Sequence, residues 1–340
     1  MTAALAAALV ASVLAKTESL VAAQAGKDAR EIAALDRRAE ALAQELRPAG
    51  WLAAAPLGAA ASDHKRPAKV RLFATSYLGF IADPAAFAPL EDVLLDAEQP
   101  GFVRSLAAQS LPGTGAPDAA VSRALCAALA QEGLPREAAE IALLPLSRLG
   151  CPEPAALVRL AKAAGPRPSG RDLALTAQAA AALGASRGAA SGRAALSLVS
   201  YFPPQGDARA RAIAALDARR DELAAWLAPE TLPVVIEALR TEGGRWDTML
   251  ALVRIAALLG PEAVPSLARL SRHSDAEVLV AAAEALAASG LPQPKAVADL
   301  EAAVAGAMTD PRFSPKDGRP DPAALLARLE KALAVLKRAR

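Results

Sequence analysis

The chain has 340 residues and a formal net charge of +2, so it carries no strong field of one sign that would attract nucleic acid or a membrane surface. Hydrophobic residues make up 54% of the chain but aromatic residues only 3%, and the two cysteines are too few for a disulfide framework. Because alanine supplies much of the apolar share and is the strongest helix former, we expect a nearly all-helical protein.

The first 47 residues have the pattern of two helices, over 2–25 and 28–47. Gly26 is a natural stop for the first helix, and Asp28 with Glu31 forms a capping box at the start of the second. The apolar repeat of the second helix is short, which favours a helix lying on its neighbours over a coiled coil. Two arrangements remain open here, a helical pair and one long helix through Gly26.

The apolar run over residues 1–15 has only part of the pattern of a signal peptide. It ends at a small residue, Ala15, but has no basic residue at its start. The run is also too short and too rich in alanine for a span across a bilayer about 30 Å thick. We therefore expect an uncleaved chain that lies in the cytoplasm and has no membrane span.

Residues 48–69 break the helical pattern. They mix alanines with prolines and glycines and contain the charged cluster 63–66, Asp-His-Lys-Arg. Such a composition is typical of a loop or linker. The sequence thus predicts a linker at 48–69, with His64 exposed, between an N-terminal helical pair at 1–47 and a larger array at 70–340.

The array is predicted to contain helices and no sheet, because no stretch of it alternates apolar and polar residues. Asp83 and Asp321 each precede a proline, which is typical of a helix N-cap followed by the first turn. Residues 310–320 should form a surface loop before a final helix with a basic end at 337–340. Helices are expected at 70–82, 84–97, 101–111, 118–132, 136–148, 153–164, 171–184, 189–201, 207–218, 221–227, 231–242, 246–259, 261–272, 276–289, 294–309 and 322–338.

The stretch from Gly260 to Gly290 shows the plan of the array most clearly, as two short amphipathic helices around a polar turn. Pro261 suits the first turn of the first helix, and Ser274 with Glu277 forms a capping box for the second. A unit this small cannot bury both apolar stripes alone, so it needs neighbours of the same kind. The stripes are Val264, Leu267 and Leu270 in the first helix, and Val278, Ala281, Ala282, Ala285 and Leu286 in the second.

The same stretch has copies elsewhere in the chain. Residues 233–260 overlay on 263–290 with their terminal glycines in register, and 87–111 is an earlier copy. Self-similarity of this kind is typical of stacked repeats. The matched apolar positions are Leu250 with Val280, Ala256 with Leu286, Val103 with Val278 and Leu111 with Leu286.

This pattern resembles HEAT repeats, particularly the short bacterial repeats also found in phycobilin lyase-like proteins. The turn between the two helices of such repeats usually reads Asp-Pro-x-Val-Arg. The residues that carry the resemblance are Asp96, Pro100, Val103 and Arg104 in the copy at 87–115, and Asp275 and Val278 in the copy at 260–290, where Leu279 replaces the arginine.

The resemblance covers residues 70–310 and implies an all-α fold, an α-solenoid of stacked antiparallel helix pairs in a HEAT-like superhelix. It also implies a polar ladder of aspartate and arginine side chains between repeats. That ladder can be only partial here, because most copies lack one or both residues. The resemblance is specific for the fold and leaves the activity open, because a fold does not fix a function.

Catalytic motifs are absent from the sequence. His64 and His273 are its only histidines, and His273 lies in a turn that should face solvent. Cys126 lies in an apolar run and is expected to pack as a small buried residue, while Cys151 follows Gly150 in a turn. Metal-ligand spacings and glycine-rich phosphate loops do not occur. We therefore predict no catalytic residue, no cofactor and no metal site, so the protein is not expected to be an enzyme.

Arg245, Trp246 and Arg254 form the most distinctive polar cluster, and with Arg104 they are the candidate partner-binding residues, because arginine and tryptophan are enriched at hot spots. A packing role for Trp246 at a helix start is the competing interpretation. We predict a non-enzymatic scaffold or adaptor that binds another protein. The alternatives are a nucleic-acid-binding module, since the cluster is similar to that of helical-repeat DNA glycosylases, and a lyase-like enzyme. Further arginines should lie on a solvated face of mixed charge: Arg209, Arg211, Arg219 and Arg220.

Overall fold

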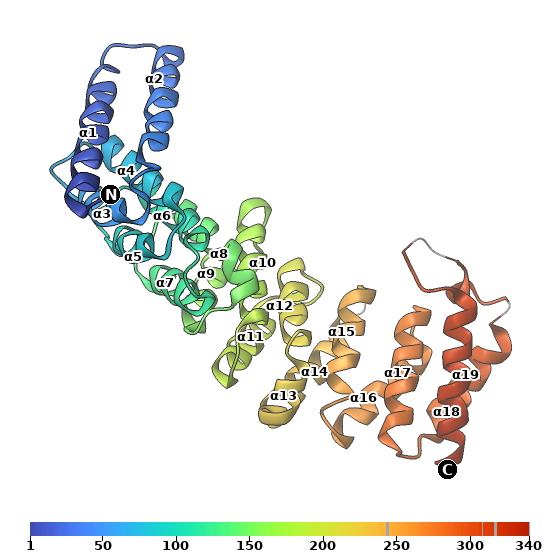
Figure 1. Ribbon diagram of the computed structural model, residues 1–340. Helices are drawn as coiled ribbons and strands as arrows, with labels where there is room; N and C mark the ends of the chain where they lie inside the picture. The colour runs from blue at the N-terminus through green and yellow to red at the C-terminus, as the bar shows by residue number, and fades with distance from the viewer. Residues whose placement is uncertain (243–244, 308, 316–317, 340) are drawn as a thin grey trace. The chain divides into compact units, whose positions relative to one another are not determined.

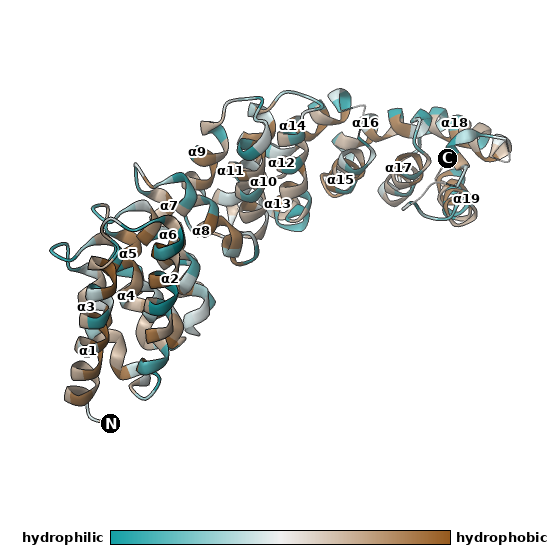
Figure 2. Ribbon diagram, turned by 90° about the horizontal axis from the view of Figure 1, so that it is seen from above, coloured by the Kyte–Doolittle hydropathy of each residue, from teal (hydrophilic) through white to brown (hydrophobic). Residues whose placement is uncertain are grey.

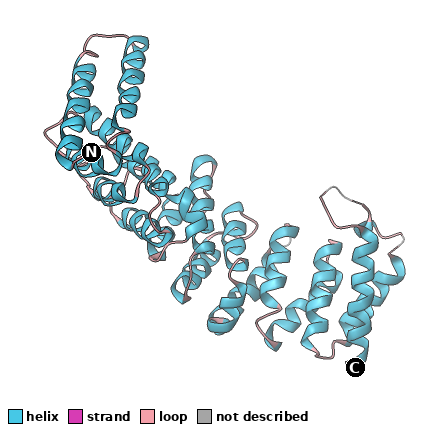
Figure 3. Ribbon diagram, viewed as in Figure 1, coloured by secondary structure: helices cyan, strands magenta, loops and turns pink. Residues whose placement is uncertain are grey.

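The computed structural model describes residues 1–242, 245–307, 309–315 and 318–339. These residues form helices joined by short loops and contain no strand, which confirms the all-α prediction (Figure 3). The helices belong to two compact units, Met1–Ala156 and Leu157–Arg340. Parts of the predicted last helices, loop and basic end lie outside the described residues: Met308, Lys316, Asp317 and Arg340.

Unit 1, Met1–Ala156, is built from antiparallel helix pairs (Figure 1). Its helices are α1 (Ala3–Ala22), α2 (Ala29–Ala41), α3 (Ala54–Ser62), α4 (Ala68–Ile81), α5 (Phe87–Leu95), α6 (Gly101–Ser110), α7 (Asp118–Ala130) and α8 (Arg136–Leu149). After the α1–α2 hairpin, α3 pairs with α4, α5 with α6 and α7 with α8. The pairs stack so that α3, α5 and α7 form one layer and α4, α6 and α8 the other, which is the arrangement of a solenoid.

The first two helices form a hairpin rather than one long helix. The chain reverses at Gly26 with φ 73°, a left-handed conformation that favours glycine. Asp28 and Glu31 then make the predicted capping box at the start of α2. The hydroxyls of Thr17 and Tyr77 lie 2.9 Å apart and join α1 to α4.

Helix α1 is hydrophobic along most of its length (Figure 2). Among the described residues it is the one helix long and apolar enough, by length and composition, to cross a membrane. The helix continues past Ala15 to Ala22, so it is longer than the apolar run over residues 1–15 from which we expected no membrane span. Only one stripe of α1 is buried in unit 1, made of Ala6, Val10, Val13, Leu14 and Thr17.

The linker predicted at 48–69 is wrong, because helix α3 lies within it. Leu57, Ala60 and Ala61 of α3 are buried, and α3 forms the first stacked pair with α4. Proline does not prevent this helix, since Pro56 lies in its first turn, where a missing N–H costs no helical hydrogen bond. The expected separation of 1–47 from the array is therefore also wrong.

Unit 2, Leu157–Arg340, repeats the plan of helix pairs. Its helices are α9 (Pro154–Ala163, whose first turn precedes the division), α10 (Gly170–Ala185), α11 (Ala189–Tyr201), α12 (Asp207–Asp217), α13 (Arg220–Trp226), α14 (Ala228–Thr241), α15 (Trp246–Ala256), α16 (Val264–Arg269), α17 (Ala276–Ser289), α18 (Pro294–Gly306) and α19 (Pro322–Arg338). One layer contains α10, α12, α15, α17 and α19, and the opposite layer contains α11, α14, α16 and α18.

The stretch 260–290 folds as a pair with two differences from the prediction. The first helix is shorter than 261–272, because three-residue 3-10 turns flank α16 on both sides. The N-cap of α17 is Asp275, whose side chain accepts hydrogen bonds from the amides of Glu277 and Val278. The predicted N-cap, Ser274, does not have this role. The predicted core is confirmed, with buried side chains at Leu267, Leu270, Val278 and Leu286.

A disulfide joins Cys126 on α7 to Cys151, just after α8. Their Cα atoms lie 5.5 Å apart, within the usual range for a disulfide. From the sequence we expected Cys126 to pack as a small buried residue, and we did not predict the disulfide. The pairing arises because the α7–α8 hairpin returns the chain beside Cys126.

Candidate functional site

The candidate residue Arg104 is buried in unit 1 and not available to a partner. Its Nε donates to the carbonyl of Leu94 at 2.8 Å, and an Nη donates to the side-chain oxygen of Gln131. Burial lowers the pKa of the Arg104 guanidinium, while the charge of Asp96 opposes this change. The predicted partner-binding role of Arg104 is therefore wrong, because its donors are used inside the stack.

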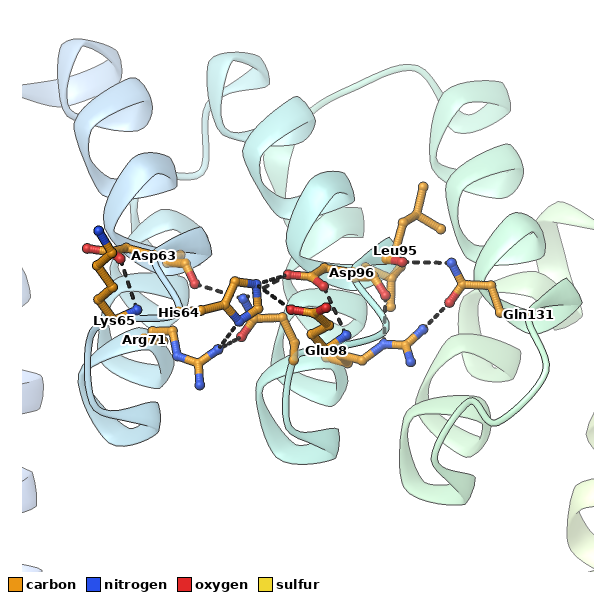
Figure 4. A network of polar contacts seen from close by, with 12 residues as sticks. Asp63, His64, Lys65, Arg71, Leu95, Asp96, Glu98 and Gln131 are labelled. Atoms are coloured by element: carbon orange, nitrogen blue, oxygen red, sulfur yellow. Dashed lines mark hydrogen bonds and ion pairs between the residues drawn. The ribbon is translucent and has the colours of Figure 1, made fainter.

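The same polar device occurs one repeat earlier, so it forms a ladder along unit 1 (Figure 4). Arg71 donates to the Gln99 side chain at 2.7 Å, as Arg104 does to Gln131. Each glutamine amide then reaches back to a carbonyl of the preceding repeat, Gln99 to Ala61 at 3.2 Å and Gln131 to Leu95 at 2.7 Å. Arginine–glutamine pairs thus carry this ladder, in place of the aspartate–arginine pairs implied by the resemblance.

Both histidines are held by neighbouring polar groups. His64 places Nε2 at 2.8 Å from an Asp96 oxygen and Nδ1 at 3.2 Å from Arg71, so it extends the ladder at the surface (Figure 4). His273 accepts the Asp275 amide at Nδ1, 3.0 Å away. These contacts fix local structure at both histidines.

The three other candidate residues belong to α15 of unit 2, with Arg245 as its N-cap, Trp246 at its first position and Arg254 in its last turn. Trp246 is 38% exposed, and the Arg319 guanidinium lies 3.5 Å from its ring centroid. Arg319 also pairs with Asp275 at 2.8 Å and Glu277 at 3.0 Å. The tryptophan therefore packs under a paired arginine, and part of its surface remains exposed.

The arginines beside Trp246 make ion pairs between helices. Arg245 pairs with Asp207 at the start of α12. The Arg254 Nε lies 3.0 Å from an Asp217 oxygen at the end of α12, and this hydrogen bond raises the pKa of Arg254. Arg245 and Arg254 therefore lie at opposite ends of α15, and each faces a carboxylate of α12.

A larger candidate site lies elsewhere in unit 2, in an open cavity of about 910 Å³. The C-terminal turn of α11, the loop after it and the first turn of α12 form one side, and α14 and the loop after α9 form the others. The lining is mainly apolar and contains several rigid prolines. The lining residues are Ala164, Pro166, Arg167, Val199, Ser200, Tyr201, Phe202, Pro203, Pro204, Arg209, Pro233, Val234 and Glu237.

A buried ion pair lies behind one wall of this cavity. The side chains of Arg209 and Glu242 are 7% and 0% exposed, and Arg209 Nε lies 3.1 Å from a Glu242 oxygen. The Glu242 carboxylate also accepts the backbone N–H of Gln205 at 3.0 Å. Gln205 has φ 62°, a conformation that non-glycine residues adopt only when their surroundings impose it. Glu242 therefore holds both Arg209 and the loop after α11 in place.

Aromatic side chains from the end of α11 and the loop after it also line the cavity. Tyr201 and Phe202 pack edge to face with ring centroids 5.2 Å apart, and the Lys162 ammonium lies 5.0 Å from the Tyr201 ring. Arg167 is exposed and makes no ion pair with a described residue. An apolar ligand with an acidic group would find both kinds of contact here.

The described residues contain no group of three or more metal-binding side chains.

The sequence did not predict this site, because it assigned Arg209 to a solvated surface. Arg209 and Arg219 are in fact buried, each beside a glutamate. The run Tyr201-Phe202-Pro203-Pro204 was a usable signal, since aromatic residues are scarce in this chain and two prolines follow them. Glu242, by contrast, is distant in sequence from Arg209, and no periodicity connects the two.

Comparisons with known proteins leave the family open. No family model matches the chain, and no curated protein matches it significantly. A solved structure of human deoxyhypusine hydroxylase in complex with glycerol is similar, with 21% identity over 97% of this chain and 98% of that chain, at a TM-score of 0.28. Because that protein is an enzyme, the comparison contradicts our predictions of a non-enzymatic scaffold and of no enzyme activity, and we withdraw them. At this identity and TM-score the likeness assigns no activity, substrate or residue role to the chain.

Proposed function

We propose that the cavity of unit 2 binds an extended segment of another protein that carries apolar side chains and an acidic group. The observation that carries the proposal is the combination of a 910 Å³ apolar cavity with an uncompensated cation, Arg167, at its edge. We propose that the cavity binds this segment, and we assign no reaction to it.

The rigidity of the cavity supports binding. Pro166, Pro203, Pro204 and Pro233 have fixed φ angles, so a ligand orders few flexible groups when it binds. Glu242 fixes the loop after α11 from behind. The volume lies within the range of roughly 300–1,000 Å³ that is typical of ligand sites.

The charges of the lining support an acidic ligand. Glu237 lines the cavity, but Arg240 binds it through two hydrogen bonds of 3.0 Å, which offsets its charge. Glu242 is similarly engaged by Arg209. Arg167 remains as an exposed cation of the lining. Arginine binds carboxylates in a geometry of two parallel hydrogen bonds.

A protein partner is better supported than nucleic acid. Phosphate binding requires several uncompensated cations, whereas Arg245 and Arg254 pair with aspartates and the chain has a net charge of only +2. Membership of the HEAT repeat proteins also stays our proposal, supported by the two layers of stacked helix pairs.

The test is a peptide-display selection from a random library, with the full chain as bait. We expect enriched peptides in which an acidic residue accompanies proline or large apolar residues. Fluorescence polarisation of one enriched peptide should show at least about tenfold weaker binding, about 1.4 kcal/mol, to Val234→Asp and to Arg167→Glu.

Arg211→Glu is the matched control, because Arg211 is exposed on α12 and does not line the cavity. It introduces the same charge change and should leave binding intact. Circular dichroism establishes that each variant is folded. Enrichment of basic peptides, or equal binding to the Arg167→Glu and Arg211→Glu variants, would overturn the proposal.

A further inference from the structure

A second cavity lies in unit 1, on the layer formed by α4, α6 and α8. It has a volume of about 320 Å³ and a wall of both apolar and polar side chains. Phe102 at its edge is 47% exposed, although it is among the largest hydrophobic side chains of the unit. Its lining residues are Glu40, Leu72, Phe73, Ser76, Phe102, Ser105, Leu106, Gln109, Glu137 and Ile141.

An unsatisfied hydroxyl lies in the lining of this cavity. Ser105 is only 4% exposed, and its Oγ has no hydrogen-bond partner among the described residues. A buried serine in a helix commonly bonds the carbonyl four residues earlier. Thr75 on α4 does so, with the Arg71 carbonyl at 2.9 Å. Ser105 therefore keeps a donor and an acceptor for a group that enters the cavity.

Two carboxylates give the cavity a negative charge. Glu40 comes from α2 and Glu137 from α8, both are exposed, and neither makes an ion pair or hydrogen bond with a described residue. The neighbouring Arg136 is engaged with Glu140, at 2.9 Å. The cavity therefore combines apolar side chains with uncompensated acids, which is complementary to a surface that carries both apolar side chains and cations.

We propose that this cavity docks a cationic amphipathic helix of a partner protein. One apolar side chain of that helix enters beside Phe102, a polar group bonds Ser105, and lysine or arginine side chains pair with Glu40 and Glu137. Three neighbouring helices of one layer line the cavity, so the surface is a groove between helical ridges, which is the form that accepts another helix. The site prefers the opposite charge to the cavity of unit 2 and is independent of it.

The probe is a labelled model peptide of about four helical turns, with leucines on one face and lysines on the other. A matched peptide replaces every lysine by glutamate. Fluorescence polarisation with the full chain, at about 0.15 M salt, should show that the lysine peptide binds at least about tenfold more tightly than the glutamate peptide.

Two variants locate the binding. The double change Glu40→Gln and Glu137→Gln should weaken the lysine peptide about tenfold, and Phe102→Ala should weaken it similarly by removing the apolar contact. The matched control is Glu91→Gln with Glu132→Gln, which removes the same charge from unit 1 outside the cavity.

The outcomes separate this site from other occupants. Loss of binding in the first double variant and in Phe102→Ala, with the control unchanged, supports the proposal. Equal loss in both double variants would mean general charge attraction and overturn it. Displacement of the peptide by butylamine at micromolar concentration would assign the cavity to small amines, and it would also overturn the docking proposal. Folding of all variants is checked by circular dichroism.

Discussion

Asp275 and Ser274 precede α17 side by side but have different roles. Asp275 accepts the amides of Glu277 at 3.0 Å and Val278 at 3.3 Å, and it also pairs with Arg319. We expect Asp275→Ala to lower the free energy of unfolding by about 1 kcal/mol or slightly more, since an N-cap is lost. Ser274→Ala should change it by less than about 0.5 kcal/mol, as for most surface changes.

Urea denaturation of the two variants measures this difference. Because the residues are adjacent, the comparison cancels effects of the surrounding turn. A larger loss for Ser274→Ala than for Asp275→Ala would contradict the cap assignment and restore the capping box that the sequence suggests.

Arg104 is a structural residue, and its removal should show this directly. Arg104→Met keeps the apolar stem but leaves the Leu94 carbonyl and the Gln131 oxygen without their donor. We expect the free energy of unfolding to fall by about 1.5–3 kcal/mol, the range for hydrogen bonds made by a charged group. Arg123→Met, at an exposed position on α7, should change it by less than about 0.5 kcal/mol.

Chemical denaturation monitored by circular dichroism provides the measurement for both arginine variants. Equal stability of the two variants would mean that the ladder contributes nothing to unit 1. The sequence could indicate Arg104 through its place in the repeat, but the choice between a buried and a surface role depends on Gln131, which lies in the next repeat.

Between elements, Glu222 on α13 links two arginines. The Arg219 guanidinium, 2.6 Å away, holds the pKa of Glu222 below its ordinary value of 4.5, burial opposes this, and Arg187 at 2.9 Å lowers it further. A carboxyl with a lowered folded-state pKa stabilises the fold above its unfolded pKa, and this stability is lost as the pH falls through the folded pKa.

The stability advantage of the wild type over Glu222→Gln should therefore be complete at pH 7. It should shrink below the ordinary pKa of 4.5 and disappear at lower pH, when Glu222 is protonated in both states. Urea titrations in steps of pH measure this difference. Glu132→Gln, which removes an exposed and unpaired carboxylate among the described residues, should give a difference that stays nearly constant.

The helices themselves could be predicted because each has an apolar stripe that repeats every three to four residues. This period locates α11 at its predicted bounds, 189–201. It fails at α3, where alanine-rich sequence gives little contrast between faces and Pro56 suggests a break.

The cavities could not be predicted, because their walls come from helices about one repeat apart and depend on which face each helix buries.

At the scale of the chain, the Cys126–Cys151 disulfide adds a covalent constraint with a sequence separation of 25. Closing a loop of this length restricts the unfolded chain and should contribute about 3 kcal/mol. Urea denaturation with and without dithiothreitol should show this loss. A variant with alanine at both cysteines should be insensitive to the reductant, and an equal response of variant and wild type would contradict the assignment.

The disulfide also bears on where the protein resides. Such bonds persist in oxidising compartments and are rare in the cytosol. The cytoplasmic location that we predict from the sequence therefore implies the dithiol form in the cell. Trapping of free thiols before lysis, followed by mass spectrometry, decides between the two states.

The same bond makes α8 part of a closed ring, which changes what a broken chain would do. The loop at 131–135 lies inside this ring, between α7 and α8. A protease that cuts only this loop would leave two fragments still joined, so the product would migrate as one species on a non-reducing gel. The fragments would separate only after reduction, although the backbone had been broken beforehand. Unit 1 can thus be nicked without being divided.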